Sequence, residues 1–134
     1  MWIEYNQNPN GDNIDDCVVR SISKVLNAPY WDVFDGLCEV MDELDGGIIN
    51  EPRVFIKYLE RHGYICHEVT EKITVGQFCK KMSKYSDKDK DTWRALLVVN
   101  GHMTAMIGDN IYDTWNCNRY KINYIFMLTN KHDV

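Results

Sequence analysis

Cys17 stands directly after a polar loop, where a helix is expected to begin, and this position favours a reactive thiol. Residues 7–14 are rich in Asn, Asp, Gly and Pro, which is typical of a loop. Asp15 and Asp16 can cap a helix that begins at or near Cys17. The unpaired N–H groups and the dipole at a helix N-terminus stabilise a thiolate. The two carboxylates act in the opposite direction, because nearby anions raise a thiol pKa. Cys17 therefore needs an imidazolium partner to serve as a nucleophile.

His102 is the residue best placed to supply that imidazolium. It stands between Gly101 and a run of apolar, strand-forming residues, so we expect it at a strand start, where its side chain can reach a cleft. His62 lies at the end of an expected helix and His132 lies near the C-terminus, and both are interpreted as surface residues. Taken singly, a histidine at a strand start is commonly structural, and a cysteine at a helix start is more often a small buried hydrophobe.

A third residue follows from the geometry of a hairpin. Gly108-Asp109 suits a two-residue type II′ turn, since glycine accepts the positive φ of the first central position. Such a turn places Thr104 opposite Asp113, on the sheet face that also carries His102. The backbones of His102 and Asp113 are then diagonal neighbours roughly 7 Å apart, a gap that a carboxylate can bridge to an imidazole. A three-residue loop would place the two side chains on opposite faces, so the prediction depends on the turn.

The elements that must position these residues divide along the chain. The first two-thirds read mostly as helices and the last third as strands, which predicts an α+β fold rather than a doubly wound sheet. We expect helices over residues 17–27, 30–44, 51–61 and 74–85, and strands over residues 64–69, 93–100, 102–107, 111–115 and 120–128. In the first helix Val18, Ile22, Val25 and Leu26 form an apolar stripe that must pack against another surface.

Length and composition indicate a single domain over residues 1–134 that can fold without disulfides or metal. The net charge is −5, and the 15 Lys and Arg are interleaved with acids, which argues against a nucleic-acid partner. We find no signal peptide and no apolar stretch near the roughly 20 residues that cross a bilayer. We therefore expect no membrane association and a cytoplasmic protein with reduced thiols. The alternating charges of residues 86–91 predict a solvated loop.

The remaining cysteines are interpreted as structural. Five cysteines, an odd number without paired spacings, do not suggest a disulfide framework. Helical spacing with apolar neighbours predicts that Cys38 and Cys79 lie in the core. His62, Cys66 and His67 could form a fragment of a zinc site, but no fourth ligand is apparent. We therefore expect neither a metal nor another cofactor.

Three motifs occur in an order that resembles the papain-like cysteine peptidases. They are Asp16-Cys-Val-Val-Arg20, Gly101-His-Met-Thr-Ala-Met-Ile107 and Tyr112-Asp-Thr-Trp115. Peptidases of this superfamily place the nucleophile at the start of an N-terminal helix and the histidine at the head of a sheet strand. The orienting Asn or Asp follows on a neighbouring strand, often two residues before a Trp. The Asp-Cys pair and the compact size resemble the bacteriocin-leader peptidase branch. The chain is most similar to small uncharacterised bacterial and phage proteins with Asp-Cys-Val-x-Arg and Tyr-Asp-Thr-Trp motifs.

The resemblance implies a papain-like fold, with N-terminal helices packed on a mainly antiparallel C-terminal sheet, and a Cys17-His102-Asp113 triad. It further implies a protein or peptide substrate and a thioester intermediate: Cys17 attacks a carbonyl, His102 protonates the leaving amine and Asp113 fixes the imidazole tautomer. Three functions remain open. The first is a peptidase or isopeptidase, the second an amidase or acyltransferase on the same triad. The third is a papain-like binding module with little catalysis, such as a phage factor that captures a host protein.

The chain departs from this family at the oxyanion hole. These peptidases usually carry a Gln six residues before the nucleophile, and Gly11 occupies that position here. The backbone N–H of Cys17 can supply one donor. Asn13 and Asn10 are candidates for the second, although asparagines in such a loop also serve simply to shape turns. The missing Gln favours the binding module, whereas the complete triad favours an enzyme.

Overall fold

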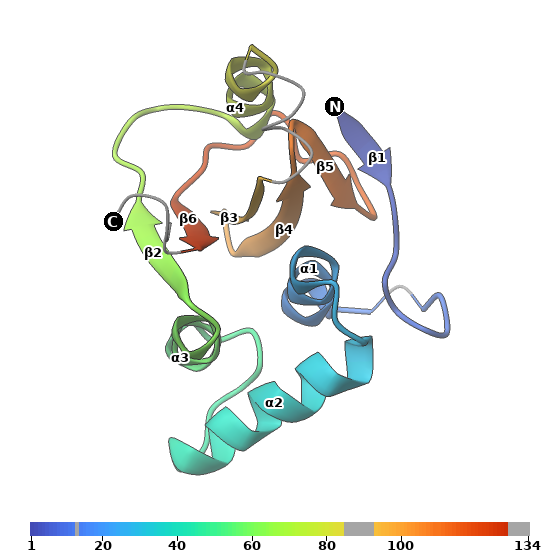
Figure 1. Ribbon diagram of the computed structural model, residues 1–134, viewed down its shortest axis with the longest axis vertical. Coiled ribbons are helices and arrows are strands. Elements are labelled where there is room, and N and C mark those ends of the chain that lie inside the picture. The colour runs from blue at the N-terminus through green and yellow to red at the C-terminus, as the bar shows by residue number, and fades with distance from the viewer. Residues whose placement is uncertain (13, 85–92, 129–134) are drawn as a thin grey trace.

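The computed structural model describes residues 1–12, 14–84 and 93–128, and these residues form the α+β fold that the sequence predicts (Figure 1). They comprise four helices and six strands. In chain order these are β1 (Trp2–Glu4), α1 (Cys17–Leu26), α2 (Tyr30–Glu43), α3 (Pro52–Arg61), β2 (Tyr64–Glu68), α4 (Val75–Met82), β3 (Arg94–Val99), β4 (His102–Ile107), β5 (Asn110–Asp113) and β6 (Tyr124–Leu128). No helix in these ranges is long and apolar enough to span a membrane. The charged run at residues 86–91 and His132 lie outside the described residues.

The six described strands join one sheet in the order β1-β5-β4-β3-β6-β2. Neighbouring strands are antiparallel, except that β1 and β5 run parallel. In Figure 1, α1, α2 and α3 lie on one side of this sheet and α4 lies on the other. The sheet is therefore mostly antiparallel, and the helices that precede most of its strands cover one of its faces.

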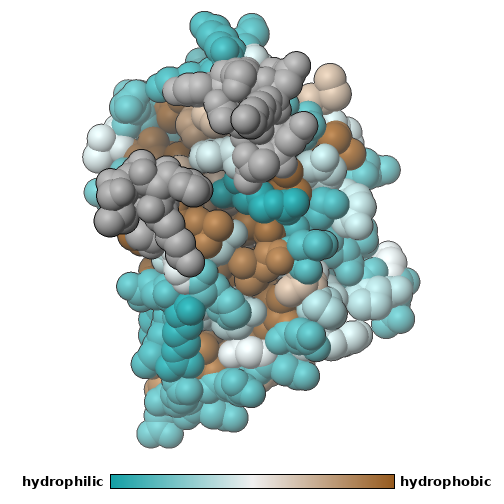
Figure 2. Space-filling view, in the orientation of Figure 1, coloured by the Kyte–Doolittle hydropathy of each residue, from teal (hydrophilic) through white to brown (hydrophobic). Residues whose placement is uncertain are grey.

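Both faces of the sheet are covered by packed side chains. Successive residues of the central strand β3 point to opposite faces, and they are buried on each face. Leu96 packs into the cluster beneath α1, α2 and α3, together with Phe126 of β6. Leu97 packs into a second cluster beneath α4, together with Val75. Figure 2 shows apolar side chains gathered in the middle of the molecule's face, with hydrophilic side chains around them.

Helix α1 is fixed on the sheet by its apolar stripe. Three stripe residues, Val18, Ile22 and Val25, are buried, and the fourth, Leu26, is partly buried against the same cluster. Ser21 Oγ donates a hydrogen bond of 2.9 Å to the Met103 carbonyl, which ties the helix to strand β4 beside His102. The helix ends at Asn27, whose φ of 52° gives the left-handed C-cap that commonly stops a helix. These contacts determine where the N-terminus of α1 lies relative to β4.

Strand β5 spans Asn110–Asp113 instead of the expected residues 111–115. Two other strands differ more from the sequence-based expectation, and each differs because of partners that are distant in the sequence. Strand β6 begins at Tyr124 rather than at residue 120. The segment before it pairs with the residues that lead into α4 instead, since Ile122 N–H donates to the Ile73 carbonyl at 2.9 Å. Strand β1 is not predicted from the sequence, and it forms by parallel pairing with β5.

Candidate active site

Cys17 lies in the first turn of α1 and is 5% exposed. Its neighbour Asp16 occupies the N-cap position, but the carboxylate makes no capping hydrogen bond, so the predicted cap is wrong. Arg20, one helical turn later, binds that carboxylate instead: its Nε donates to Oδ1 at 2.6 Å. Asp15 is exposed, and its carbonyl accepts a hydrogen bond of 3.3 Å from Asn50 Nδ2. The Asp16 carboxylate therefore does not occupy the first N–H groups of α1, whose dipole favours negative charge beside Cys17.

A tight turn brings the next two residues onto one face of the sheet. Ile107 pairs with Asn110, which confirms a two-residue loop between β4 and β5. Gly108 has a φ of 62°, the positive value that the first central position of a type II′ turn requires. With this register, His102 at the start of β4 and Asp113 at the end of β5 point to the same side.

Cys17, His102 and Asp113 lie together, although they belong to three different elements. His102 Nε2 is 2.7 Å from Asp113 Oδ2, and the Cys17 side chain is in contact with the same imidazole. Because Nε2 faces the carboxylate, Nδ1 is the ring nitrogen that remains for the sulfur. The His102 side chain is 14% exposed and the Asp113 side chain only 1%. With the carboxylate of Asp113 on one side of the imidazole and the sulfur of Cys17 on the other, the site can hold a thiolate beside an imidazolium.

The charges of these side chains stabilise one another. Burial alone would lower the pKa of His102, but the hydrogen bond to Asp113, the contact with Cys17 and the charges of both groups raise that pKa from 6.5 to about 9. Burial would likewise raise the pKa of the Asp113 carboxyl, yet His102 holds it below its ordinary value. The Thr114 N–H contributes to this effect by donating to Asp113 Oδ1 at 2.7 Å. At neutral pH the pair is therefore an imidazolium and a carboxylate.

Trp115 packs against the imidazole of His102. The two ring centroids are 4.7 Å apart with an interplanar angle of 43°. The Tyr120 ring packs against the indole in a T-shaped arrangement, with centroids 5.5 Å apart. Trp115 itself is 39% exposed. The indole therefore lies at the surface and separates part of the imidazole from water.

A buried polar network extends from Asp113 to the residue before the nucleophile. Arg20 Nη1 donates to Asp113 Oδ1 at 3.3 Å, while its Nε binds Asp16. The second oxygen of Asp16 accepts hydrogen bonds from Tyr30 Oη at 2.7 Å and from Asn8 Nδ2 at 3.1 Å. All five residues are buried. The sequence reasoning did not assign this role to Arg20, although Asp16 and Arg20 stand four residues apart, the spacing of a helical ion pair.

The two oxyanion candidates selected from the sequence lie in the loop between β1 and α1. Asn13 is outside the described residues. Asn10 is exposed, and its backbone N–H donates to Asn8 Oδ1 at 2.9 Å. This contact is a local turn bond made by the Asn10 backbone, and the role of the Asn10 side chain stays a prediction.

Gln7, in the same loop, has a polar group available that the sequence reasoning missed. Its side-chain Nε2 is buried without a hydrogen-bond partner among the described residues. The loop is anchored to the site on both sides of Gln7. Tyr5 N–H donates to the Asp113 carbonyl at 2.9 Å, and Asn8 binds Asp16. Gln7 precedes Cys17 by ten residues instead of six, so the spacing of known peptidases could not identify it.

Among the described residues, no other cysteine or histidine side chain is hydrogen-bonded to His102 or Asp113. All five cysteines are free. Burial and the charge of Asp113 raise the pKa of the Cys117 thiol to about 12, and burial also raises the pKa of Cys79. His62 stacks on Tyr58, with ring centroids 4.4 Å apart. Within the described ranges, no group of three or more His, Cys, Asp and Glu side chains could hold a metal ion.

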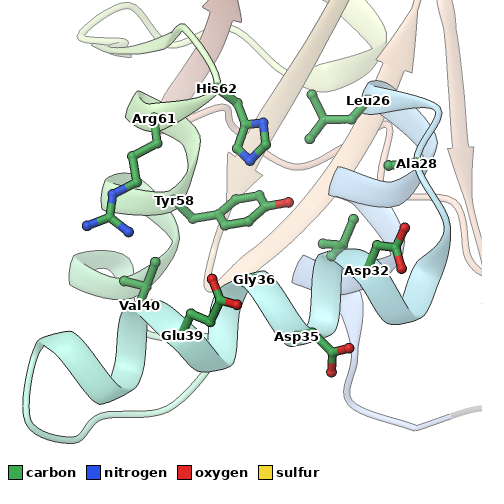
Figure 3. A pocket seen from close by; sticks show the side chains of 11 residues that line it. Leu26, Ala28, Asp32, Asp35, Gly36, Glu39, Val40, Tyr58, Arg61 and His62 are labelled. Atoms are coloured by element: carbon green, nitrogen blue, oxygen red, sulfur yellow. The ribbon is translucent and has the colours of Figure 1, made fainter.

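A pocket of about 550 Å³ opens between α2 and α3 (Figure 3). In Figure 3 the Tyr58 ring projects from α3 toward α2, whose Asp32 and Glu39 flank the opening. The lining residues come from α2, α3 and the end of α1, and none comes from β4 or β5. This pocket is therefore separate from the cluster around Cys17.

Comparisons of the chain with protein-family models, with curated proteins and with solved structures find no match. The function is accordingly inferred from the site itself: a thiol at a helix N-terminus, an imidazole in contact with it and a buried carboxylate behind the imidazole.

Proposed function

We propose that the protein is a papain-like cysteine hydrolase, a peptidase or isopeptidase, with Cys17 as nucleophile. The observation that carries this proposal is the contact of His102 with two partners, the Cys17 side chain and Asp113 Oδ2 at 2.7 Å. A thiol, a base and an orienting carboxylate in this order are the minimal set for nucleophilic acyl transfer. Their elements follow one another as in the papain-like peptidases that the sequence resembles.

In the proposed reaction the Cys17 thiolate attacks a carbonyl carbon of a protein or peptide, and the carbonyl oxygen becomes an oxyanion. His102 then donates its proton to the leaving amine as the C–N bond breaks, which leaves a thioester on Cys17. A water molecule gives a proton to His102 and attacks the thioester, releasing the acid and restoring the Cys17 thiolate beside the protonated His102. Asp113 keeps the imidazole oriented and stabilises its charged form throughout.

Two donors are proposed for the oxyanion. The backbone N–H of Cys17 lies at the helix N-terminus, where the Asp16 carboxylate makes no capping bond. The buried Nε2 of Gln7 has no partner among the described residues and lies in a loop anchored to both Asp113 and Asp16. Removing one such donor typically lowers kcat by about 10²–10³-fold. Gln7→Ala should therefore reduce turnover without changing the alkylation of Cys17, and Asn10→Ala provides a matched control from the same loop.

A first experiment tests the nucleophile. The full chain is treated briefly with iodoacetamide at pH 7, and the five thiols are mapped by peptide mass spectrometry. Cys79 is the matched control, because it is 5% exposed, as is Cys17. Cys17 should be labelled much faster than Cys79, since only Cys17 has an imidazolium partner. Equal labelling of the two thiols would contradict the proposal.

A second experiment separates hydrolysis from its alternatives. The chain is incubated with a peptide library, with and without hydroxylamine, and products and Cys17 adducts are identified by mass spectrometry. Carboxylate products that disappear in Cys17→Ala indicate a hydrolase. If acyl products form only when hydroxylamine is present as the acceptor, the protein is an acyltransferase on the same triad. A reactive Cys17 without any turnover would instead favour a binding module. The proposed setting is the cytoplasm, where the five free thiols would stay reduced.

A further inference from the structure

Arg20 lies between two carboxylates that act on opposite ends of the proposed reaction centre. One belongs to Asp16, the residue directly before Cys17, and the other to Asp113, which orients His102. Arg20 Nε is 2.6 Å from Asp16 Oδ1 and its Nη1 is 3.3 Å from Asp113 Oδ1. The Arg20 and Asp16 side chains are each 6% exposed and the Asp113 side chain 1%. A cation so deeply buried therefore interacts with both anions with little screening by water.

The charges around Cys17 come from several packed elements. Helix α1 contributes Asp16 and Arg20, β4 contributes His102, β5 contributes Asp113, α2 contributes the neutral Tyr30 hydroxyl, and the buried Cys117 follows β5. Asp16, Arg20 and Asp113 together carry a net charge of −1. Without Arg20 that sum would be −2, and the extra anion would oppose formation of a thiolate on Cys17.

We propose that Arg20 is a positioning residue for this site, which offsets the charge of Asp16 beside Cys17 and holds Asp113 in place behind His102. The inference rests on the proposed function, since it names how that same triad is kept charged. It also explains why an acidic residue is tolerated next to the nucleophile. The Asp16 carboxylate is committed to Arg20, Tyr30 and Asn8, so its charge is shared by three donors.

The geometry favours arginine over lysine at this position. Two different nitrogens of one planar guanidinium bind two carboxylates from different elements, Nε toward α1 and Nη1 toward β5. A lysine carries a single nitrogen on a flexible stem and cannot fix both carboxylates in this way. Arg20 thereby fixes the position of β5, and with it Asp113, relative to the helix that carries Cys17.

The test is the pH dependence of Cys17 alkylation by iodoacetamide in the full chain, for wild type and for Asp16→Asn, Arg20→Met and the double variant. Arg20→Met should raise the pH midpoint by about one unit, because one uncompensated anion is left near the thiol. Asp16→Asn should lower it. The double variant restores the net charge to −1, so its midpoint should return close to that of wild type. A purely structural role for Arg20 predicts no such recovery, and an unrecovered midpoint would overturn the inference.

Two comparisons keep the test decisive. Removing one partner of a buried ion pair is strongly destabilising, so Arg20→Met is first checked for native circular dichroism. If it does not fold, the double variant is compared with Asp16→Asn, and the loss of Arg20 should again raise the midpoint. Equal midpoints in that pair would overturn the inference. The proposed function fails separately, if wild-type Cys17 reacts no faster than Cys79.

Discussion

His102 is the residue whose replacement tests the proposed chemistry most directly. Its imidazole contacts both the Cys17 side chain and Asp113. His102→Ala should raise the pH midpoint of Cys17 alkylation by about one unit or more, because an imidazolium partner strongly favours the thiolate. His67→Ala is the control, since His67 is exposed on β2. An unchanged alkylation profile in His102→Ala would mean that His102 is not the base.

The raised pKa of His102 also predicts how stability depends on pH. The value of about 9 in the folded chain lies above the ordinary 6.5, so folding favours the charged imidazole. This contribution is fully present below pH 6.5 and is lost as the pH rises through about 9. The difference in free energy of unfolding between wild type and His102→Gln should therefore shrink over that interval. Urea denaturation at pH 6 to 10 measures it, and a constant difference would contradict the assignment.

Asp113 is tested by a series of three variants. Asp113→Asn should keep part of the activity, because Asn retains a hydrogen-bond acceptor and serves as the orienting residue in many papain-like enzymes. Asp113→Ala should lose more, on the order of 100-fold in turnover, since the imidazole is then free to rotate or change tautomer. Asp109→Ala, in the neighbouring turn, should behave like wild type. If Asp113→Ala matches Asp109→Ala in thiol reactivity and turnover, the orienting role fails.

At the residue scale, the sequence predicts positions that follow a local rule, but it does not predict contacts between buried residues that are distant in the sequence. The alternation of strand residues after the Gly108-Asp109 turn was enough to place Asp113 and His102 on one face. Arg20 could not be assigned in the same way, because nothing in its neighbourhood reveals a partner on β5, 93 residues away. A second contact of Arg20 explains the error at Asp16, whose carboxylate binds this buried cation instead of capping the helix.

At the scale of elements, the turn between β4 and β5 controls the register of the site. Gly108 has a φ of 62°, which is strained for any residue with a Cβ. Gly108→Ala should lower the free energy of unfolding by about 1–2 kcal/mol. It should also reduce Cys17 reactivity, because a shift of register moves Asp113 away from His102. Denaturant unfolding and iodoacetamide labelling measure the two effects, with Asp109→Ala as the control. An Ala variant as stable as this control would contradict the argument.

The elements that follow local patterns were predicted well, and those that depend on distant partners were not. Helix α3 has Pro52 in its first turn, and α4 has the Thr74–Gln77 capping box at its N-terminus. Strand β1 is three residues long, and its pairing with β5 joins Trp2 to Ile111. A segment so short carries too little alternation to be recognised before its partner is known.

At the scale of the whole molecule, the sheet order separates strands that are adjacent in the sequence. Strand β6 lies between β3 and β2, so the C-terminal strand bridges two parts of the chain that precede it. The hydrophobic pattern of β3 indicates a strand buried on both faces, but it does not state which neighbours flank it. The α+β class was therefore predictable from the segregation of helices and strands, whereas the strand order required the structure.

The double-sided burial of β3 leads to a last prediction about cooperativity. Leu96 and Leu97 are both fully buried, Leu96 toward α1, α2 and α3 and Leu97 toward α4. Each replacement by Ala should lower the free energy of unfolding by about 2–5 kcal/mol, the usual cost of such a cavity. Because adjacent residues of one strand anchor both clusters, either variant should shift a single transition. Far-ultraviolet circular dichroism and tryptophan fluorescence should then give the same urea midpoint. Two separate transitions, or a variant that shifts only one of the two signals, would mean that the two faces of the sheet unfold independently.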